Sequence, residues 1–261
     1  MIVVGEKLNS SIPKTLTAIN HSDTDYLIRL IQEQEENGAD FLDINTAICG
    51  EYELSKLIWL IDLAQKHSKC GIMIDSPSPA VIKEAVKTIK DRKIIINSIT
   101  LTDRIDELLP VIKETGASVV GLPIDDVTLP ETVEKRVENS KKLIQKVTDF
   151  GIPMEHIYID VLAEALSVGN NNALNAVNTI RILKELYPNI KTICGLSNIS
   201  FGLPKRLNIN CAFLTAAVVA GLDSAIMDIN LQAMKTCLAA SLAIAGQDDY
   251  CLEYISAIRS L

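Results

Sequence analysis

The feature that most limits the fold is an alternation that repeats eight times along the chain. Each unit is a short apolar run rich in β-branched residues, followed by an amphipathic segment with helical spacing. The predicted strands cover residues 2–8, 39–46, 71–76, 93–99, 118–125, 157–161, 191–198 and 224–229. Parallel strands covered on both faces read as continuous apolar runs, and each needs a crossover to reach the next. Eight such units in about 250 residues predict a closed (β/α)8 TIM barrel.

The intervening segments carry helix signals. Residues 25–38 close on Gly38, as expected at a helix C-terminus, and residues 53–67 repeat apolar side chains at three- and four-residue spacing. Residues 78–90 begin with Ser78 as an N-cap and Pro79 in the first turn. No linker or low-complexity tract divides the chain, so we expect one domain over 1–261. An open doubly wound sheet is the alternative, but no GxGxxG follows a first strand.

Composition excludes several classes of partner. The net charge is −8, with no basic run of five or more, which disfavours nucleic-acid binding. MIVVGEKLNS does not resemble a signal peptide, and the longest apolar run, near 212–222, falls short of a membrane span. The six cysteines are scattered without a CxxC pair, as expected for buried free thiols in a reducing compartment. We therefore expect a cytoplasmic protein that does not enter a membrane.

Polar residues end nearly every predicted strand. They are Glu6, Asn9, Asp43, Asn45, Asp75, Ser76, Asn97, Ser98, Asp125, Asp126, Asp160, Ser197, Asn198 and Asp228. The C-terminal strand ends of a barrel converge on one mouth, where active sites lie. For Asp43 or Asp125 alone, the N-cap of the next helix is the simpler reading. It does not explain a whole rim of carboxylates and amides with almost no cations, which suits a ligand rich in N–H donors and not a phosphate.

Other constellations of reactive residues are not supported. His21, His67 and His156 lack zinc-ligand spacing, and neither a GxSxG elbow nor a Walker A loop is present. The position of Cys194 before Gly195 indicates packing and not nucleophilic chemistry. Several carboxylates could hold magnesium, but clustered Asp and Asn serve hydrogen bonding equally well and no phosphate motif accompanies them. We expect no metal.

The blocks at the strand ends resemble a known family. In order, they read GEKLNS, GADFLDINT, IMIDS, IINS, IYIDV, GLSNISFGLPKR and GLDSAIMD, from about residue 1 to 230. They look like the pterin-binding methyltransferases, which include methyltetrahydrofolate:corrinoid protein methyltransferases and the folate domain of cobalamin-dependent methionine synthase. Dihydropteroate synthase shares this barrel, but GEKLNSS and DINTAIC stand where its early Asn-x-Thr-x-Asp-Ser-Phe-Ser and Ser-Thr-Arg-Pro segments would lie.

The resemblance implies roles for individual residues. Asp75, Asn97 and Asp160 would hold the pterin ring, whose 2-amino-4-oxo edge offers adjacent N–H donors that a carboxylate accepts in pairs. Asn198 would lie near N5 of the folate and donate a hydrogen bond as the N5–methyl bond breaks. The remaining implied substrate-site residues are Gly195 and Ser197, which shape the same loop, Arg206, near the aminobenzoate or glutamate tail, and Glu6, Asn9 and Asp43.

The activity implied is transfer of a methyl group between N5 of tetrahydrofolate or 5-methyltetrahydrofolate and the cobalt of a corrinoid. The chain lacks the Asp-x-His-x-x-Gly segment of corrinoid modules, so cobalamin is expected on a separate corrinoid protein. The resemblance also implies a homodimer. Both directions of methyl transfer stay open. Two alternatives remain: a divergent enzyme similar to dihydropteroate synthase, and a folate-binding subunit without catalytic activity.

Overall fold

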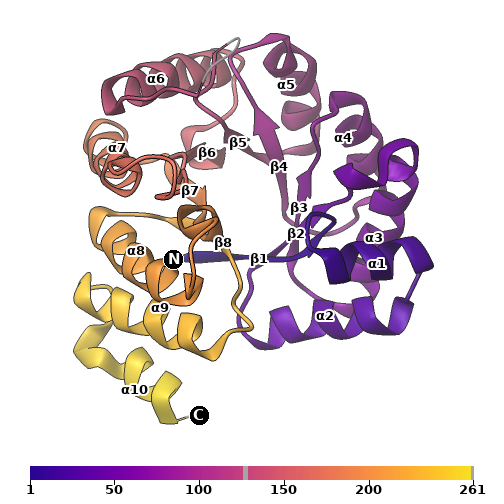
Figure 1. The fold of residues 1–261 in the computed structure, drawn as a ribbon. Helices are drawn as coiled ribbons and strands as arrows, with labels where there is room; N and C mark the ends of the chain where they lie inside the picture. Colours follow the sequence, from indigo (N-terminus) through magenta and orange to yellow (C-terminus); the bar gives the residue numbers. More distant parts are fainter. Residues whose placement is uncertain (126–128, 260–261) are drawn as a thin grey trace.

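The structure, a computed structural model, describes residues 1–125 and 129–259. Parallel strands β1 to β8 pair in chain order, and β8 pairs with β1 to close a barrel (Figure 1). The strands are β1 Ile2–Asn9, β2 Phe41–Asn45, β3 Gly71–Asp75, β4 Ile94–Ile99, β5 Ser118–Gly121, β6 Ile157–Asp160, β7 Lys191–Gly195 and β8 Ser224–Met227. The predicted (β/α)8 barrel is confirmed.

Helices cover the outside of this barrel (Figure 1). They are α1 Pro13–His21, α2 Thr24–Glu36, α3 Glu53–His67, α4 Pro79–Ala85, α5 Asp103–Thr115, α6 Val133–Asp149, α7 Asn172–Leu186, α8 Arg206–Ala220, α9 Gln232–Ile244 and α10 Leu252–Arg259. Short 3-10 turns are η1 Ala47–Tyr52, η2 Val86–Thr88, η3 Met154–His156, η4 Leu196–Ser200 and η5 Asp249–Cys251. None of the described helices is long and apolar enough to span a bilayer.

Several predicted boundaries need correction. The helix predicted over 53–67 matches α3, and Ser78 caps α4 by accepting the Val81 N–H at 3.4 Å. The helix predicted over 78–90 is too long, because the chain tightens into η2 and is extended at Ile89. The predicted strand 118–125 ends at Gly121, shortly before Pro123, which has no N–H for a ladder. The predicted strand 191–198 ends at Gly195, so Ser197 and Asn198 lie on η4.

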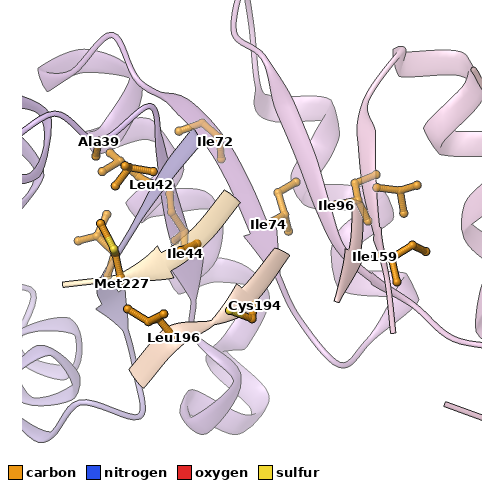
Figure 2. Close-up of a cluster of buried hydrophobic side chains, with 14 of the residues drawn as sticks. Ala39, Leu42, Ile44, Ile72, Ile74, Ile96, Ile159, Cys194, Leu196 and Met227 are labelled. Carbon is orange, nitrogen blue, oxygen red and sulfur yellow. The ribbon is translucent and has the colours of Figure 1, made fainter. Parts of the chain in front are cut away.

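The strands bury two different cores on their two faces. The outward residues, among them Leu42, Ile44, Ile72, Ile74 and Ile96, join the helices in one large apolar cluster (Figure 2). The alternate residues face inward, and those nearest the strand starts form a second apolar cluster inside the barrel: Val4, Phe41, Met73, Ile95, Val120, Tyr158 and Ile193, with Ile2 and Ile226 against it. This inner cluster fills the half of the barrel nearest the strand starts, and we call it the apolar floor.

The cysteine expectation holds only in part. All six thiols are free, and Cys70 and Cys194 are buried, but Cys251 is exposed and the other three are half-buried. Burial raises the pKa of Cys194 well above its ordinary value, which keeps this thiol neutral and fits a packing role.

Candidate functional site

The polar strand-end residues continue the inward-facing rows of the barrel. Because side chains alternate along a strand, a residue two positions beyond a floor residue also points inward. Asp43 follows Phe41 in this way, Asp75 follows Met73, Asn97 follows Ile95, and Asp160 follows Tyr158. Gly195 and Asp228 stand in the same relation to Ile193 and Ile226. The mouth is therefore lined by a polar layer that rests directly on the apolar floor.

Three adjacent strands bring one group of polar side chains together. The strand register pairs Asn45 with Asp75 and Asp75 with Asn97, so the three side chains lie side by side. Asn45 Nδ2 donates to Asp75 Oδ2 at 2.8 Å. Burial raises the pKa of Asp75, and this hydrogen bond, followed by the charge of Arg104, opposes the shift. One edge of the Asp75 carboxylate is thus fixed by the protein.

Asp160 comes from β6 on another side of the barrel. Its Oδ1 accepts the backbone N–H of Leu162 at 2.8 Å. Burial raises the pKa of Asp160 to about 6, against the Leu162 hydrogen bond and the charge of Arg136, and with a further upward contribution from Asp75. Asp160 is therefore mainly ionised at neutral pH, yet close enough to its pKa to respond to weak acid.

Asp43 lies one layer below Asn45 on the same strand. It is 2% exposed, and its Oδ1 has no hydrogen-bond partner among the described residues. Burial raises its pKa well above the ordinary value, reinforced by the negative charges of Asp75 and Glu6, while a hydrogen bond from Asn9 lowers it. Asp43 is part of β2 and not the N-cap of a helix, so the simpler reading of this residue is wrong.

A second group forms where β1, β8 and the loop after β7 meet. Ser197 Oγ donates to the Glu6 carboxylate at 2.9 Å and 3.1 Å, and Lys7 forms an ion pair with Asp228. Burial raises the pKa of Glu6, an effect that the Ser197 hydrogen bond and Lys7 oppose. Arg206 Nη2 donates to the carbonyl of Ser197 at 2.6 Å, which ties the guanidinium to this loop.

Asn198 is exposed at the barrel mouth, on η4. Its side chain lies across Gly195: a Cβ placed at Gly195 would stand 2.9 Å from Asn198 Nδ2. Among the described residues, no protein group forms a hydrogen bond with this carboxamide. The glycine thus gives a free amide donor room to lie over the end of β7.

Sequence reasoning missed several residues that shape the site. The strand ends were expected to have almost no cations, but Lys7 pairs with Asp228, and Arg104 donates to the carbonyls of Ser76, Pro77 and Ser98. Glu53 accepts the Ser76 hydroxyl at 2.6 Å. Lys7 could have been recognised as a site residue from its position in GEKLN, because a lysine is unusual within a strand that is otherwise mostly buried.

Two further expectations concern the residues after β5 and metal binding. The Asp125 carboxylate forms an ion pair with Lys135 at 3.1 Å. Asp126 lies outside the described residues. Within 1–125 and 129–259, no three His, Cys, Asp or Glu side chains gather in a way that could hold a metal ion.

The raised pKa of Asp160 predicts a stability that depends on pH. The folded protein takes up this proton near pH 6, and the unfolded chain does so near 3.8. The contribution of Asp160 protonation to the free energy of unfolding is therefore complete below pH 3.8, and it is lost as the pH rises through 6. Asp160→Asn keeps an acceptor for Leu162 without the buried charge. It should raise the free energy of unfolding by about 1 kcal/mol near pH 7.5, and by less near pH 5. Denaturant unfolding at the two pH values measures this.

Asp125→Asn is the matched control, because Lys135 lowers the pKa of Asp125 and its neutralisation should not stabilise the protein. A gain for Asp160→Asn that is equal at both pH values would contradict the assignment.

Comparison with known proteins places this geometry in a family. The pterin binding enzyme family model matches residues 5–228. The chain is 35% identical over 262 residues to a methylcorrinoid:tetrahydrofolate methyltransferase of Eubacterium limosum, covering 99% of this chain and 96% of that protein. It is 31% identical over 241 residues to the methionine synthase of Mycobacterium tuberculosis, covering 87% of this chain but only 20% of that longer protein.

Solved structures agree on the fold. A dihydropteroate synthase from Coxiella burnetii in complex with pteroic acid superimposes with a TM-score of 0.69 at 22% identity, covering 94% of this chain and 93% of that one. Yersinia pestis dihydropteroate synthase gives a TM-score of 0.68 at 16% identity, covering 95% and 94%. The family model spans most of the barrel and the predicted pterin site. The chain therefore belongs to the family of pterin binding enzymes.

Proposed function

We propose that this protein transfers a methyl group between N5 of tetrahydrofolate and the cobalt of a corrinoid carried by a separate protein. One observation carries the proposal. A carboxylate and amide layer suited to a pterin lies in the same mouth as an unpaired carboxamide, that of Asn198 over Gly195. The near full-length similarity to a methylcorrinoid:tetrahydrofolate methyltransferase supports it. A methyl group can move in either direction through this geometry.

In this proposal Asp75, Asn97 and Asp160 hold the pterin ring. Ionised Asp75 and Asp160 accept N–H donors from the pyrimidine edge, and the Asn97 amide serves a mixed donor and acceptor position. The apolar floor beneath them excludes water from one side, which strengthens these hydrogen bonds. Asp43, two residues before Asn45 on β2, supports this layer from below. Asn9 lies level with Asn45 in the strand register and forms a hydrogen bond with the Asp43 carboxylate.

Asn198 acts on the reacting atom. Release of a methyl group leaves the bonding electron pair on N5, and the amine leaves poorly unless N5 receives a proton or a hydrogen bond. The Asn198 amide donates that bond without being a strong acid, and its contact strengthens as charge grows on N5. Ser197, held by Glu6, and Arg206, bonded to the Ser197 carbonyl, keep the loop in place.

The corrinoid supplies the cobalt that accepts or donates the methyl group. The polar groups of the mouth are mainly carboxylates and amides, which fit the N–H groups of a pterin and do not offer a nitrogen ligand to cobalt. We therefore assign cobalt no ligand on this chain. Large apolar side chains are exposed on the loops that follow the strands, where a partner protein would dock. They are Ile48, Tyr52, Leu129, Val168, Phe201 and Leu231. We call these residues the apolar rim.

The purified protein should be colourless and bind tetrahydrofolate without retaining cobalamin. Methyl transfer should require an added corrinoid, and a cognate corrinoid protein should serve far better than free cobalamin, because docking fixes the orientation that a free corrinoid finds by diffusion. Absorbance of the isolated protein and turnover with each corrinoid test this. Val168→Asp, at a rim residue 79% exposed, should slow only the reaction with the corrinoid protein.

Ile244→Asp is the matched control, since Ile244 is 67% exposed at the end of α9 and outside the rim. Tightly bound cobalamin in the isolated chain would refute the proposal. So would folate binding without methyl transfer to any corrinoid, the result expected of a non-catalytic subunit.

We also propose that two copies associate through the outer face of α7 and α8. Leu174, Val177, Phe213, Ala216 and Val219 line an apolar groove of about 600 Å³ between these helices. Leu174 and Val219 are exposed in the single chain, and burial of such a face against a second copy would stabilise a dimer.

A further inference from the structure

Arg136 is buried completely although it carries a charge. It is 0% exposed, in the first turns of α6, on the face that also buries Val137, Ser140 and Leu143. A buried guanidinium is strongly destabilising unless its N–H groups are bonded. Arg136 Nε donates to the Pro130 carbonyl at 3.0 Å, Nη1 donates to the Val161 and Leu162 carbonyls at 3.1 Å and 2.9 Å, and Nη2 pairs with Glu164. The side chain therefore joins the segment before α6 to the end of β6.

One peptide unit links Arg136 to the site. The Val161 carbonyl and the Leu162 N–H belong to the same planar unit, and in a trans peptide these two groups point in opposite directions. The carbonyl accepts from Arg136, and the N–H donates to Asp160 Oδ1 at 2.8 Å. Leu162 has a φ of 56°, in the left-handed region. A residue with a bulky side chain rarely adopts this conformation unless neighbouring groups hold the backbone there. The guanidinium supplies that support.

We propose that Arg136 is a positioning residue for pterin binding: it holds the 161–162 peptide so that its N–H orients the Asp160 carboxylate toward the ligand. This inference rests on the proposed function, in which Asp160 binds the pterin. Arg136 itself does not touch the ligand. A cation on the carbonyl side of a peptide also polarises its N–H, which strengthens the hydrogen bond to Asp160.

The charges around Asp160 give a readout that a purely structural role would not change. Arg136 of α6 lowers the pKa of Asp160, and Asp75 of β3 raises it. Cys194 of β7 packs in the outer apolar cluster and stays neutral, because burial and the Asp160 charge raise its pKa. Glu164, in the loop after β6, is paired with Arg136. Loss of the Arg136 charge should raise the pKa of Asp160 above 6, so that the ionised form needed by the pterin is reached only at higher pH.

The test is the dissociation constant of tetrahydrofolate between pH 5 and 8 for wild type, Arg136→Gln and Arg136→Lys. Arg136→Gln should weaken binding roughly tenfold at pH 7 and shift the acid limb of binding to higher pH. Arg136→Lys keeps the charge but loses the planar guanidinium that bonds several carbonyls at once. It should therefore weaken binding while the acid limb of the pH dependence stays at nearly the same pH. Lys146→Gln is the control and should bind as wild type, because Lys146 is a half-buried cation on the same helix that pairs with Asp106.

A double variant separates positioning from folding. If Arg136→Gln does not fold, Arg136→Lys is compared in wild-type and Asp160→Asn backgrounds. Positioning predicts that the lysine variant loses affinity only when Asp160 is present. An equal loss in both backgrounds, or wild-type affinity and pH profile in a folded Arg136→Gln protein, would overturn the inference. Failure of the wild type itself to bind tetrahydrofolate would instead refute the proposed function.

Discussion

Asn198→Ala is expected to lower the methyl-transfer rate on the order of 100-fold, while the affinity for tetrahydrofolate changes little. The reason is that the amide acts mainly when the N5–methyl bond breaks and charge develops on N5, so its loss raises the barrier more than it weakens ground-state binding. The side chain is exposed and lies over Gly195 without a protein partner, so its removal should not disturb the barrel. Single-turnover kinetics and calorimetric titration measure the two quantities separately.

Asn208→Ala is a suitable control, because Asn208 is also an exposed asparagine, in the first turn of α8. Normal turnover by Asn198→Ala would remove this residue from the mechanism. A loss of rate matched by an equal loss of folate affinity would assign Asn198 to ground-state binding instead.

The second large effect is expected at Asp75. Asp75→Ala should weaken tetrahydrofolate binding by about 1.5–3 kcal/mol, the range for a hydrogen bond to a charged group, which is roughly a 10- to 100-fold increase in the dissociation constant. Asn45 fixes Asp75 Oδ2 at 2.8 Å, so the other oxygen meets the ligand in a defined direction. Asp160→Ala should have an effect of similar size, and calorimetry with tetrahydrofolate measures both.

Asp125→Ala provides the contrast, since Asp125 also follows a strand but pairs with Lys135. Its folate affinity should be unchanged. If folded Asp75→Ala and Asp160→Ala proteins both bind tetrahydrofolate as tightly as the wild type, the pterin site lies elsewhere.

The barrel was predictable because two local signals agree in all eight units. β-Branched apolar runs favour buried parallel strands, and amphipathic segments between them favour crossover helices. Boundaries at the mouth were less predictable. The predicted strand 191–198 is too long, because the chain turns into η4 after Gly195 and places Ser197 against Glu6. That turn depends on a partner in β1, which local pattern cannot include.

The positions of the mouth carboxylates were predictable from the sequence, and the groups that orient them were much less so. A polar residue at the end of a buried strand stands out, which placed Asp75, Asn97 and Asp160 at the mouth, while their assignment to a pterin comes from the family resemblance. Arg136 does not stand out, because a charged residue in an amphipathic helix is normally assigned to the solvent face. Its role depends on which carbonyls the 161–162 turn presents to α6, and only the folded chain fixes that path.

The hydrogen bond between Ser197 and Glu6 joins residues that are 191 positions apart. Glu6 belongs to β1 and the loop of Ser197 follows β7, so the two can meet only after most of the barrel has been synthesised. The contact between β8 and β1 that closes the barrel also depends on the last of the strands. In the proposed function, tetrahydrofolate would meet a complete site only after β7 and β8 have joined the barrel. Ligand binding would then report closure of the whole barrel and not the folding of one part of it.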